Sequence, residues 1–594
     1  MIYLIYMKKT LSLLITCLSV IVATGQEAKV NPNVIIVLSD DQGYGDLSVH
    51  GNPLLKTPAL DKMYAESIRM SNFHVSPLCT PTRGQLMTGM DAMHNKASTV
   101  RFGRGRIQRD MVTMPEAFRD NGYTTGLFGK WHLGDTYPDR PMDRGFQKAL
   151  WFKGWGLASE AEFDNDYYKT RYLDGLKTIQ SSKYCTDLWF DEAMKWMGEM
   201  SDKKQPFFTY LSLNVTHGPF YAPDEDYEFY RNKVEDKNTA MFLGMVRNMD
   251  TNMARLDKWL TEKGLKENTI VIFMNDNGGT GGVKVYNAGM RDIKGSNYDG
   301  GHRAICFLQW SKGPIGKPRT ISYPTEVQDL LPTFIDLLGF RRDQNYHFDG
   351  ESLKPILQNP AKATASRMFV VQHMAANNLK KFGGCVVMDS WRLVGEDELY
   401  DVSKDPGQQQ NVAASNPDIL KKMKDHYEKW WAVTSPEANK VVPVIVGSDQ
   451  EETVLVTCSE WLTESINTQW AVANGQGSAK GGAYKLYAEK KGKYLIELSR
   501  WPFHLNRSLT AAGPATAVGG TSIQPGKSLA IDAGTVSLNN SVVNTVKAAA
   551  DATKISMEVN MEAGDNKLQA WFKDKDGKDL IGAYFVNITK TKSE

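Results

Sequence analysis

Cysteine is scarce in this chain of 594 residues. Only six cysteines are present, and the first of them, Cys17, lies in an apolar segment near the N-terminus. The other five are far apart in the sequence, unlike the closely spaced cysteines of a small disulfide scaffold. The composition therefore excludes a disulfide-stapled fold, and we expect any bridge to be incidental.

An excess of charge of one sign is also absent. The chain has 70 Lys and Arg against 68 Asp and Glu, a formal net charge of +2. This balance gives no general attraction to a polyanion, so we expect no nucleic-acid partner. Beyond the N-terminus the sequence has no apolar run long enough to span a bilayer, so we expect no transmembrane segment in the mature protein.

Residues 1–25 have the pattern of an export signal. Lys8 and Lys9 form a basic start, Leu11–Ala23 is an apolar core too short for a membrane span, and small residues precede a cleavage site after Gly25. We therefore expect an exported protein that is periplasmic or secreted.

Two apolar, β-branched runs predict strands that are buried on both faces, as in a sheet covered by helices. They are "NVIIVL" (33–38) and "TIVIFM" (269–274). Residues 206–214 predict a further strand, and 239–265 have apolar residues at helical spacing. Strands alternating with helices predict a layered α/β domain, to which we assign residues 26–365.

The rest of the chain has shorter predicted strands and a different pattern of turns. Residues 366–435 predict a smaller α+β subdomain of short strands followed by a helix over 416–431. A proline at Ser435-Pro436 predicts a break after that helix. Residues 436–594 contain short alternating segments between Gly, Lys, Asp and Asn turns, which is typical of a β-sandwich.

Acidic and amide side chains follow both buried strands directly. Asp40 and Asp41 come after the first strand, and Asp276 and Asn277 come after the second. Ligands bind beyond the carboxyl ends of strands in open α/β sheets, and three carboxylates gathered there would repel one another without a cation. Hard oxygen ligands favour Ca²⁺ or Mg²⁺ over Zn²⁺. Either pair alone fits an ordinary acidic turn better, but the two together favour a metal site.

The stretch "PLCTPTRG" places one cysteine at the predicted start of a helix. Thr80 is a suitable N-cap and Pro81 a suitable first helical residue. Cys79 would then lie where backbone N–H groups favour an anion, and Arg83 would add a guanidinium in the same turn. Taken alone, Cys79 is more readily interpreted as a buried structural cysteine.

Several motifs together change that interpretation. They are "SDDQGYGD" (39–46), "CTPTRG" (79–84), "GKWHLG" (129–134), "NDNGG" (275–279), "KGSNYDGGHR" (294–303) and "LYDVSKDPGQQQN" (399–411). In this order they resemble the type I, formylglycine-dependent sulfatases, arylsulfatase-like members of the alkaline phosphatase superfamily. The resemblance covers about residues 30–435. His302 departs from it, because many members have an apolar residue there.

The resemblance implies a fold and a chemistry. The fold is α/β: an alkaline-phosphatase-like mixed sheet with helices on both faces and a small α+β C-terminal subdomain, to which this chain adds a β-sandwich. A maturation enzyme oxidises the signature cysteine, here Cys79, to formylglycine. One hydroxyl of the hydrated aldehyde then attacks sulfur, and the other helps to eliminate sulfate.

By the same resemblance, each motif position has an implied role. The Ca²⁺ ligands are Asp40, Asp41, Asp276, Asn277 and the modified residue 79. Arg83 holds the diol, whereas Lys130 and Lys294 bind sulfate oxygens. His132 is the base that starts elimination, and His217 binds sulfate or protonates the leaving oxygen, since the pKa of histidine permits both near neutrality.

Two features lie outside these motifs. The segment 101–109 contains Arg101, Arg104, Arg106 and Arg109, which either bind neighbouring sulfates or form a solvated loop. Four tryptophans either stack on sugars or pack in a core: Trp151, Trp155, Trp501 and Trp571, of which we place Trp571 in a core.

Three functions remain in competition. The first is a sulfatase acting on a sulfated carbohydrate, whose specificity depends on loops 95–110 and 150–185. The second is a phosphonate monoester or phosphodiester hydrolase of the same superfamily. The third is a non-catalytic glycan-binding protein in which Cys79 is never converted. The intact catalytic motifs favour the first.

Overall fold

The computed structural model describes most of the chain beyond the N-terminus. The described residues are 31–157, 159–163, 165–168, 170–341, 347–363, 366–513, 516–518, 521–523 and 525–591. The predicted export signal, residues 1–25, lies outside them. Asn33–Glu594 form one unit, and no helix in the described ranges is long and apolar enough to cross a bilayer.

A ten-stranded mixed sheet occupies the centre of the first half of the described chain. Its strands in spatial order are β12 (Arg319–Ile321), β2 (Ile68–Met70), β11 (Cys306–Gln309), β9 (Thr269–Asn275), β1 (Asn33–Ser39), β8 (Phe207–Ser212), β4 (Thr124–Lys130), β5 (Lys148–Phe152), β6 (Thr170–Asp174) and β7 (Lys177–Ser181). All residues of β1, β8 and β9 are buried, which confirms the strand predictions. β1 runs parallel to both β8 and β9, with Ser39 opposite Asn275, so β1 and β9 end side by side.

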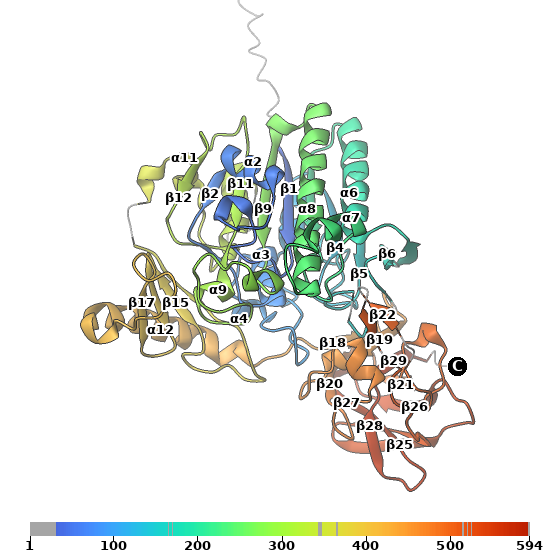
Figure 1. Ribbon diagram of the computed structural model, residues 1–594. Coiled ribbons are helices and arrows are strands. Elements are labelled where there is room, and N and C mark those ends of the chain that lie inside the picture. Colours follow the sequence, from blue (N-terminus) through green and yellow to red (C-terminus); the bar gives the residue numbers. More distant parts are fainter. Residues whose placement is uncertain are drawn as a thin grey trace, which may run out of the picture. The chain divides into compact units, whose positions relative to one another are not determined.

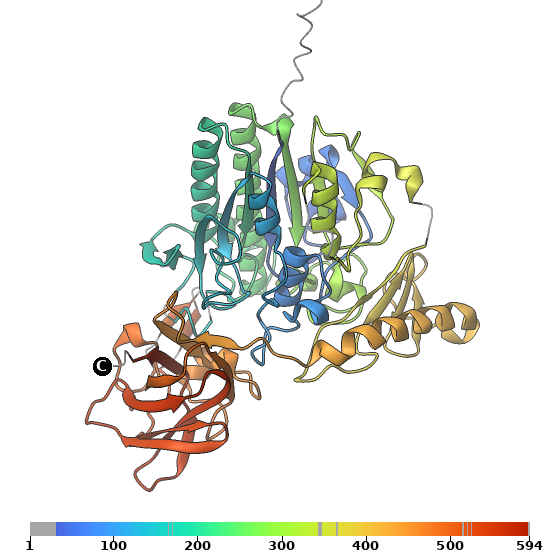
Figure 2. The same ribbon diagram turned by 180° about the vertical axis from the view of Figure 1, so that it is seen from behind.

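Helices cover both faces of this sheet (Figures 1 and 2). They are α2 (Pro58–Glu66), α3 (Cys79–Thr88), α4 (Ala92–Asn95), α5 (Met114–Asp120), α6 (Cys185–Asp202), α7 (Asp224–Tyr230), α8 (Lys237–Glu262), α9 (Asp299–His302), α10 (Leu330–Leu338) and α11 (Lys354–Gln358). Ile35 and Val37 of β1 pack in one core with α6 and α8, whereas Val34 and Ile36 pack in a second core with α3, α5 and α10. Successive strand residues point to opposite faces, so both faces must be apolar and covered.

Two smaller sheets adjoin the central one. A three-stranded sheet contains β10 (Arg303–Ala304), β3 (Phe73–His74) and β13 (Thr325–Glu326). An antiparallel sheet contains β14 (Met368–Val371), β15 (Cys385–Met388), β16 (Trp391–Val394) and β17 (Glu398–Asp401), and α12 (Pro417–Ala438) packs against it. The expected break at Ser435-Pro436 is wrong, because α12 continues through Pro436 to Ala438.

Residues 444–590, which we call the C-terminal module, form two packed sheets. One contains β18 (Val444–Val446), β20 (Ala483–Ala488), β27 (Gly564–Lys573), β24 (Ala533–Leu538), β25 (Ser541–Lys547) and β28 (Asp579–Gly582). The other contains β19 (Thr453–Thr457), β29 (Phe585–Lys590), β21 (Gly492–Ser499) and β26 (Ile555–Met561). A short hairpin of β22 (Thr516–Val518) and β23 (Thr521–Ile523) and a short helix, α13 (Gln469–Ala473), complete the module.

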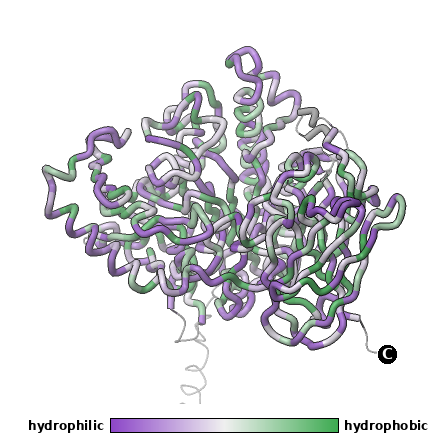
Figure 3. Tube along the Cα trace, turned by 90° about the horizontal axis from the view of Figure 1, so that it is seen from below, coloured by the Kyte–Doolittle hydropathy of each residue, from purple (hydrophilic) through white to green (hydrophobic). Residues whose placement is uncertain are grey.

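The core of the C-terminal module lies between its two sheets. Tyr484 and Leu568 of one sheet pack in the same core as Ile496 and Val586 of the other. Residues of β26 alternate between buried and exposed, as the sequence pattern predicts for a sandwich. Hydrophobic and hydrophilic stretches alternate along the trace near the C-terminus (Figure 3). The fold class expected from the sequence is therefore confirmed.

Candidate active site

The four metal-ligand candidates meet at one edge of the central sheet. Asp40 and Asp41 follow β1, and Asp276 and Asn277 follow β9, the strand paired beside it. All four are buried. The Asp41 backbone N–H donates to Asp276 Oδ1 at 3.3 Å, and Asn277 Nδ2 donates to the same oxygen at 2.7 Å. The parallel register thus brings the two motifs together.

Cys79 begins α3, and it lies at the same edge. The expected N-cap, Thr80, is wrong: Leu78 has the extended N-cap backbone, with no capping side-chain bond, and Cys79 is the first helical residue. The Thr80 hydroxyl instead contacts His132 Nε2 at 3.0 Å. Cys79 therefore lies inside the first turn, where backbone N–H groups lack helical partners.

Arg83, one turn after Cys79 in α3, extends into the carboxylates. Its Nη2 lies 2.7 Å from Asp276 Oδ2, and its Nη1 donates to Ser212 Oγ at 2.5 Å. Asp40 Oδ1 is 4.0 Å from the same guanidinium. Since Arg83 is fully buried, its charge compensates the carboxylates directly.

Both candidate lysines pair with the acidic residues after β1. Lys130, at the end of β4, places Nζ 2.6 Å from Asp40 Oδ2. Lys294 forms an ion pair with Asp41. Both lysines favour ionisation of the Cys79 thiol, so their charges lie close to it.

The two candidate histidines approach from different elements. His132 Nδ1 lies 3.4 Å from Cys79 Sγ. His217 Nδ1 donates to the Gly218 carbonyl at 2.7 Å, and its Nε2 lies 3.5 Å from Asp41 Oδ2. Burial lowers the pKa of both histidines, with Lys130 acting in the same direction at His132 and Lys294 at His217. Both imidazoles are therefore neutral near pH 7.

The oxygen atoms present fit a hard cation. Asp40 Oδ1 and Asn277 Oδ1 are buried and have no hydrogen-bond partner among the described residues. Ligand atoms of Asp40, Cys79 and Asp276 lie within 4.8 Å of one another. Burial would raise the pKa of Asp40, but Lys130 and Arg83 hold it far below its ordinary value, so this carboxylate is ionised. A buried, unpartnered oxygen is costly unless an ion binds it, and carboxylate and amide oxygens are the ligands that Ca²⁺ prefers.

The Cys79 thiol itself is a poor nucleophile in this setting. Burial raises its pKa above the ordinary value, despite the nearby Lys130 and Lys294. The thiol is therefore protonated at neutral pH, whereas a nucleophilic cysteine needs the thiolate. In the described part of the chain Cys79, Cys185, Cys306, Cys385 and Cys458 are all free and buried.

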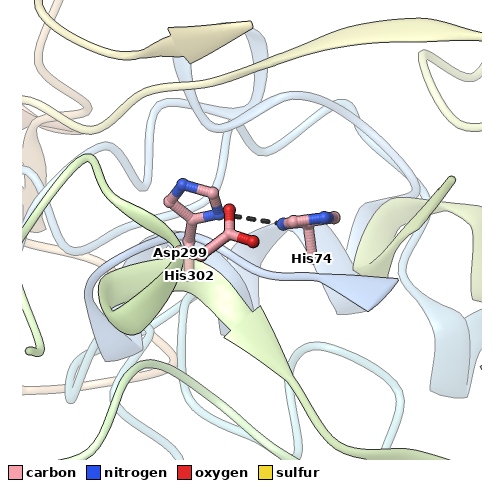
Figure 4. Close-up of side chains that lie close together, drawn as sticks. All are labelled: His74, Asp299 and His302. Carbon is pink, nitrogen blue, oxygen red and sulfur yellow. Dashed lines mark hydrogen bonds between the residues drawn. The ribbon is translucent and has the colours of Figure 1, made fainter. Parts of the chain in front are cut away.

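A second cluster of ionisable groups joins His74 of β3 to Asp299 and His302 of α9 (Figure 4). His74 Nδ1 is 2.9 Å from His302 Nδ1, and ligand atoms of both lie within 4.8 Å of those of Asp299. Arg392 Nε already pairs with Asp299 Oδ1 at 2.7 Å, and its positive charge disfavours a cation here. We interpret the cluster as structural support for the turn that contains His302.

Most arginines of the segment 101–109 are neither solvated nor free to bind an anion, because other parts of the chain engage them. Arg106 pairs with Asp139 and Glu460, and Arg109 pairs with Asp139 as well. Arg104 is buried and donates to the carbonyl of Ala438 at 3.2 Å. Three of the four arginines thus hold other parts of the chain, and Arg101 alone is exposed.

The candidate tryptophans divide in the same way. Trp151, Trp501 and Trp571 are buried, which confirms the expected core position of Trp571. Trp155 is partly exposed, and its ring centre lies 4.8 Å from that of His217. The sequence did not predict Thr80 and Ser212 as site residues. Thr80 was predicted only as a helix N-cap, and nothing in the apolar strand 206–214 singled out Ser212.

The fold and these contacts fit a hydrolase of the alkaline phosphatase superfamily, with acidic side chains after two parallel strands and a buried cysteine at a helix start. More specifically, the chain belongs to the sulfatase family, a family of sulfuric ester hydrolases: residues 32–340 match the profile described as Sulfatase.

Curated and solved relatives agree with this family. The chain is 29% identical over 354 residues to mouse arylsulfatase J, spanning 55% of this chain and 57% of that protein. It is 28% identical over 378 residues to rat N-acetylgalactosamine-6-sulfatase, spanning 58% of this chain and 69% of that enzyme. The crystal structure of Ps i-CgsB in complex with k-i-k-neocarrahexaose superposes with a TM-score of 0.61 at 27% identity, covering 69% of this chain and 94% of the other.

Proposed function

We propose that this protein is an exported sulfatase that removes sulfate from a sulfated carbohydrate, using formylglycine made from Cys79 and assisted by Ca²⁺. One observation supports this most strongly: α3 begins at Cys79, with its side chain beside Asp40, Asp276 and His132. Residues from three separate motifs therefore surround the one atom that the family's modification would change.

The residues that would hold Ca²⁺ are Asp40, Asp41, Asp276 and Asn277. When bound, the ion would supply positive charge that stabilises negative charge on a sulfate ester and lowers the pKa of a coordinated hydroxyl. Arg83 contacts Asp276 and lies close to Asp40, so it fixes the orientation of these carboxylates. We consider Mg²⁺ a weaker candidate, because it demands a stricter octahedral geometry than Ca²⁺.

The side chains around residue 79 have separable tasks. Cys79 Sγ stands in for a hydroxyl oxygen of the hydrated aldehyde, the group that supplies the nucleophile once the modification is made. The neutral His132 can accept a proton at Nδ1, which faces that atom at 3.4 Å. Lys130 and Lys294 place two ammonium groups beside the same position, suited to the oxygens of a sulfate.

His217 lies on the Asp41 side of the site. Its Nδ1–H is occupied by the Gly218 carbonyl, which leaves Nε2 as the nitrogen that faces the site. Once protonated at Nε2, it can bind a sulfate oxygen or give that proton to the leaving alcohol.

A carbohydrate substrate is supported by the relatives. The name of the rat enzyme refers to N-acetylgalactosamine 6-sulfate, and the solved Ps i-CgsB complex contains k-i-k-neocarrahexaose. The export pattern of residues 1–25 is consistent with a polysaccharide met outside the cytoplasm. N-terminal sequencing of the native protein would show cleavage after Gly25 if this part of the proposal holds.

The test is to co-express the chain with a formylglycine-generating enzyme and to measure the mass of the peptide spanning Cys79. Sulfate release is then assayed on sulfated galactose and N-acetylgalactosamine saccharides with Ca²⁺ present. We expect the formylglycine mass together with sulfate release. Turnover of phosphonate monoesters or phosphodiesters instead would favour the related hydrolase, and an unmodified Cys79 with glycan binding would favour a non-catalytic protein.

A further inference from the structure

A polar cleft beside His132 is built by four separate parts of the chain. Its lining includes residues of the segment 100–105, which we call the arginine loop, and of the segment 132–135. Gly154 and Trp155, in the tryptophan loop (153–157), also line it. Ser459 and Glu460 of the C-terminal module complete the lining.

Buried contacts fix the arginine loop to the segments that lead into and form the C-terminal module. Arg106, just after the loop, donates to Glu460 Oε1 at 2.9 Å while it also pairs with Asp139. Arg104 donates to the carbonyls of Ala438 and Asn439 at 3.2 and 3.1 Å. Because these guanidinium groups are almost fully buried, the contacts cannot be exchanged for water without large cost.

The tryptophan loop is held by the module in the same way. Trp155 Nε1 donates to the Asn467 carbonyl at 2.6 Å. Gln469 Nε2 donates to the carbonyls of Leu157 and Glu162 at 3.3 and 3.0 Å. Thr457 Oγ1 donates to the buried Glu160 at 2.7 Å. The orientation of the Trp155 ring is therefore set by the C-terminal module.

Two side chains of the cleft remain available to a ligand. Trp155 is partly exposed, with its ring between the module and His217. Arg101 is exposed, and its guanidinium makes no ion pair with the described part of the chain. The acidic groups of the cleft are engaged: Glu460 pairs with Arg106, and Asp135 accepts from the Gly154 backbone N–H at 2.8 Å.

We propose that the C-terminal module completes a binding site for the sugar next to the sulfated one, with Trp155 as its stacking surface and Arg101 as the contact for an anionic substituent. This inference rests on the proposed function and deepens it. A rigid indole offers a large apolar face to the C–H side of a sugar ring. A guanidinium recognises a carboxylate or a second sulfate through paired hydrogen bonds. The substrate class is thus a sulfated glycan of at least two sugars whose neighbouring sugar also bears an anionic group.

The first experiment compares substrates of different size. The probes are 4-methylumbelliferyl sulfate, a sulfated monosaccharide and sulfated di- and tetrasaccharides with and without a second anionic group. We expect Trp155→Ala to lower kcat/KM on the oligosaccharides at least about tenfold more than on the aryl sulfate. Trp155→Phe should retain most of the oligosaccharide activity, because it keeps an aromatic face.

Arg101→Ala should lower kcat/KM about tenfold only on oligosaccharides with the second anionic group. Matched controls are Trp470→Ala, an exposed tryptophan of the module that does not line the cleft, and Arg119→Ala, an exposed arginine of α5. Both controls should behave as wild type. Equal losses on aryl sulfate and oligosaccharide, or no losses, would overturn the proposal.

A binding measurement separates this inference from the proposed function. In the Cys79→Ala background no formylglycine can form, and calorimetry with the same tetrasaccharides measures affinity alone. We expect the further change Trp155→Ala to weaken binding at least about tenfold, whether or not the parent protein releases sulfate. If wild type releases no sulfate but Trp155→Ala still weakens tetrasaccharide binding, the proposed function is rejected and the binding site is kept. Absence of binding in the Cys79→Ala parent would overturn the site.

Discussion

The edge of the central sheet and the cleft beside His132 lie next to each other, yet they are assembled differently. At the sheet edge, Asp40, Asp41, Asp276 and Asn277 follow directly on two paired strands, so backbone hydrogen bonds alone bring them together. In the cleft, loops are held by the C-terminal module through side chains such as Arg106 and Glu460, which are 354 residues apart.

This difference indicates how substitutions in each of the two regions should affect chemistry and stability. The positions at the sheet edge are set by strand register, so a substitution there alters the chemistry while the strand pairing that places the other ligand candidates remains. The positions in the cleft are set by buried polar pairs, so a substitution there alters stability and substrate choice together. Each of the following experiments tests one side of this contrast.

The largest effect is expected at Cys79. Cys79→Ala removes the only atom that the modification can use, so we expect sulfate release to fall by at least about three orders of magnitude. Among the described residues His132 is the hydrogen-bond partner of the thiol, so the melting temperature should change by only a few degrees. Sulfate release and thermal melting on the same preparation check both statements.

The matched control for this change is Cys306→Ala. Cys306 is equally buried, on β11, but lies outside the site motifs. This variant should keep its specific activity while it loses some stability through the small cavity. Comparable activity in the two alanine variants would contradict the assignment of Cys79 as the precursor.

The second largest effect concerns the cation. Asp40→Asn removes one carboxylate from the candidate ligand set, and we expect a loss of about two to three orders of magnitude in kcat/KM with a lower calcium content. Chelation of wild type should lower activity and melting temperature together, with recovery on adding Ca²⁺. Elemental analysis and activity measured in parallel provide the check.

Asp46→Asn is the control for the loss of a nearby buried carboxylate. Asp46 accepts from the Gly43 backbone N–H at 2.8 Å and is not among the candidate ligands. An asparagine oxygen can accept the same bond, so this variant should keep its calcium. If both variants kept calcium and activity, the four-residue ligand set would be wrong.

These two experiments concern the part of the molecule that the sequence predicts well. The runs 33–38 and 269–274 are recognisable as strands because burial on both faces demands uninterrupted apolar residues. The side chains that follow them are then placed by strand pairing without further information. The domain boundaries and the roles of the site residues remain predictions until such experiments are made.

The sequence predicts less where distant partners override a local rule. Thr80 has the chemistry of an N-cap, but its hydroxyl contacts His132, and Leu78 occupies the cap position. Pro436 suggests a helix end, yet α12 includes it. Arg104, Arg106 and Arg109 have their partners at Asp139 and in or near the C-terminal module, which no local pattern reveals.

A third, smaller effect tests the contact with the C-terminal module. Arg106→Met leaves Asp139 and Glu460 without one of their cations, and we expect the free energy of unfolding to fall by about 3–5 kcal/mol. Urea unfolding measures the loss. Arg119→Met, which breaks an exposed pair with Asp120, should cost no more than about 1 kcal/mol.

A double-mutant cycle sharpens this prediction. Combining Arg106→Met with Glu460→Gln should cost less than the sum of the single changes, because the second change removes a carboxylate that the first leaves unpaired. Additive losses would mean that the pair does not couple the loop to the module.

The smallest effect is a dependence on pH at the same contact. Burial raises the pKa of Glu160 to about 7, although bonds from Ser459 and Thr457 act in the opposite direction. Between its ordinary value of 4.5 and about 7 the folded protein therefore holds a proton that the unfolded chain releases. Folding stability must then fall as pH rises through this range, and it stays lower above it.

Glu160→Gln removes this titration and leaves the rest of the contact in place. Relative to the variant, wild type should lose roughly 1–3 kcal/mol of unfolding free energy between pH 4.5 and pH 7.5. Glu162, whose pKa burial raises to about 8, titrates in both proteins and cancels in the difference. Urea unfolding at several pH values gives the comparison. If the free energy of unfolding changed with pH in the same way in both proteins, Glu160 would be solvated. The tryptophan loop would then be held against the module less tightly than the Thr457 bond indicates.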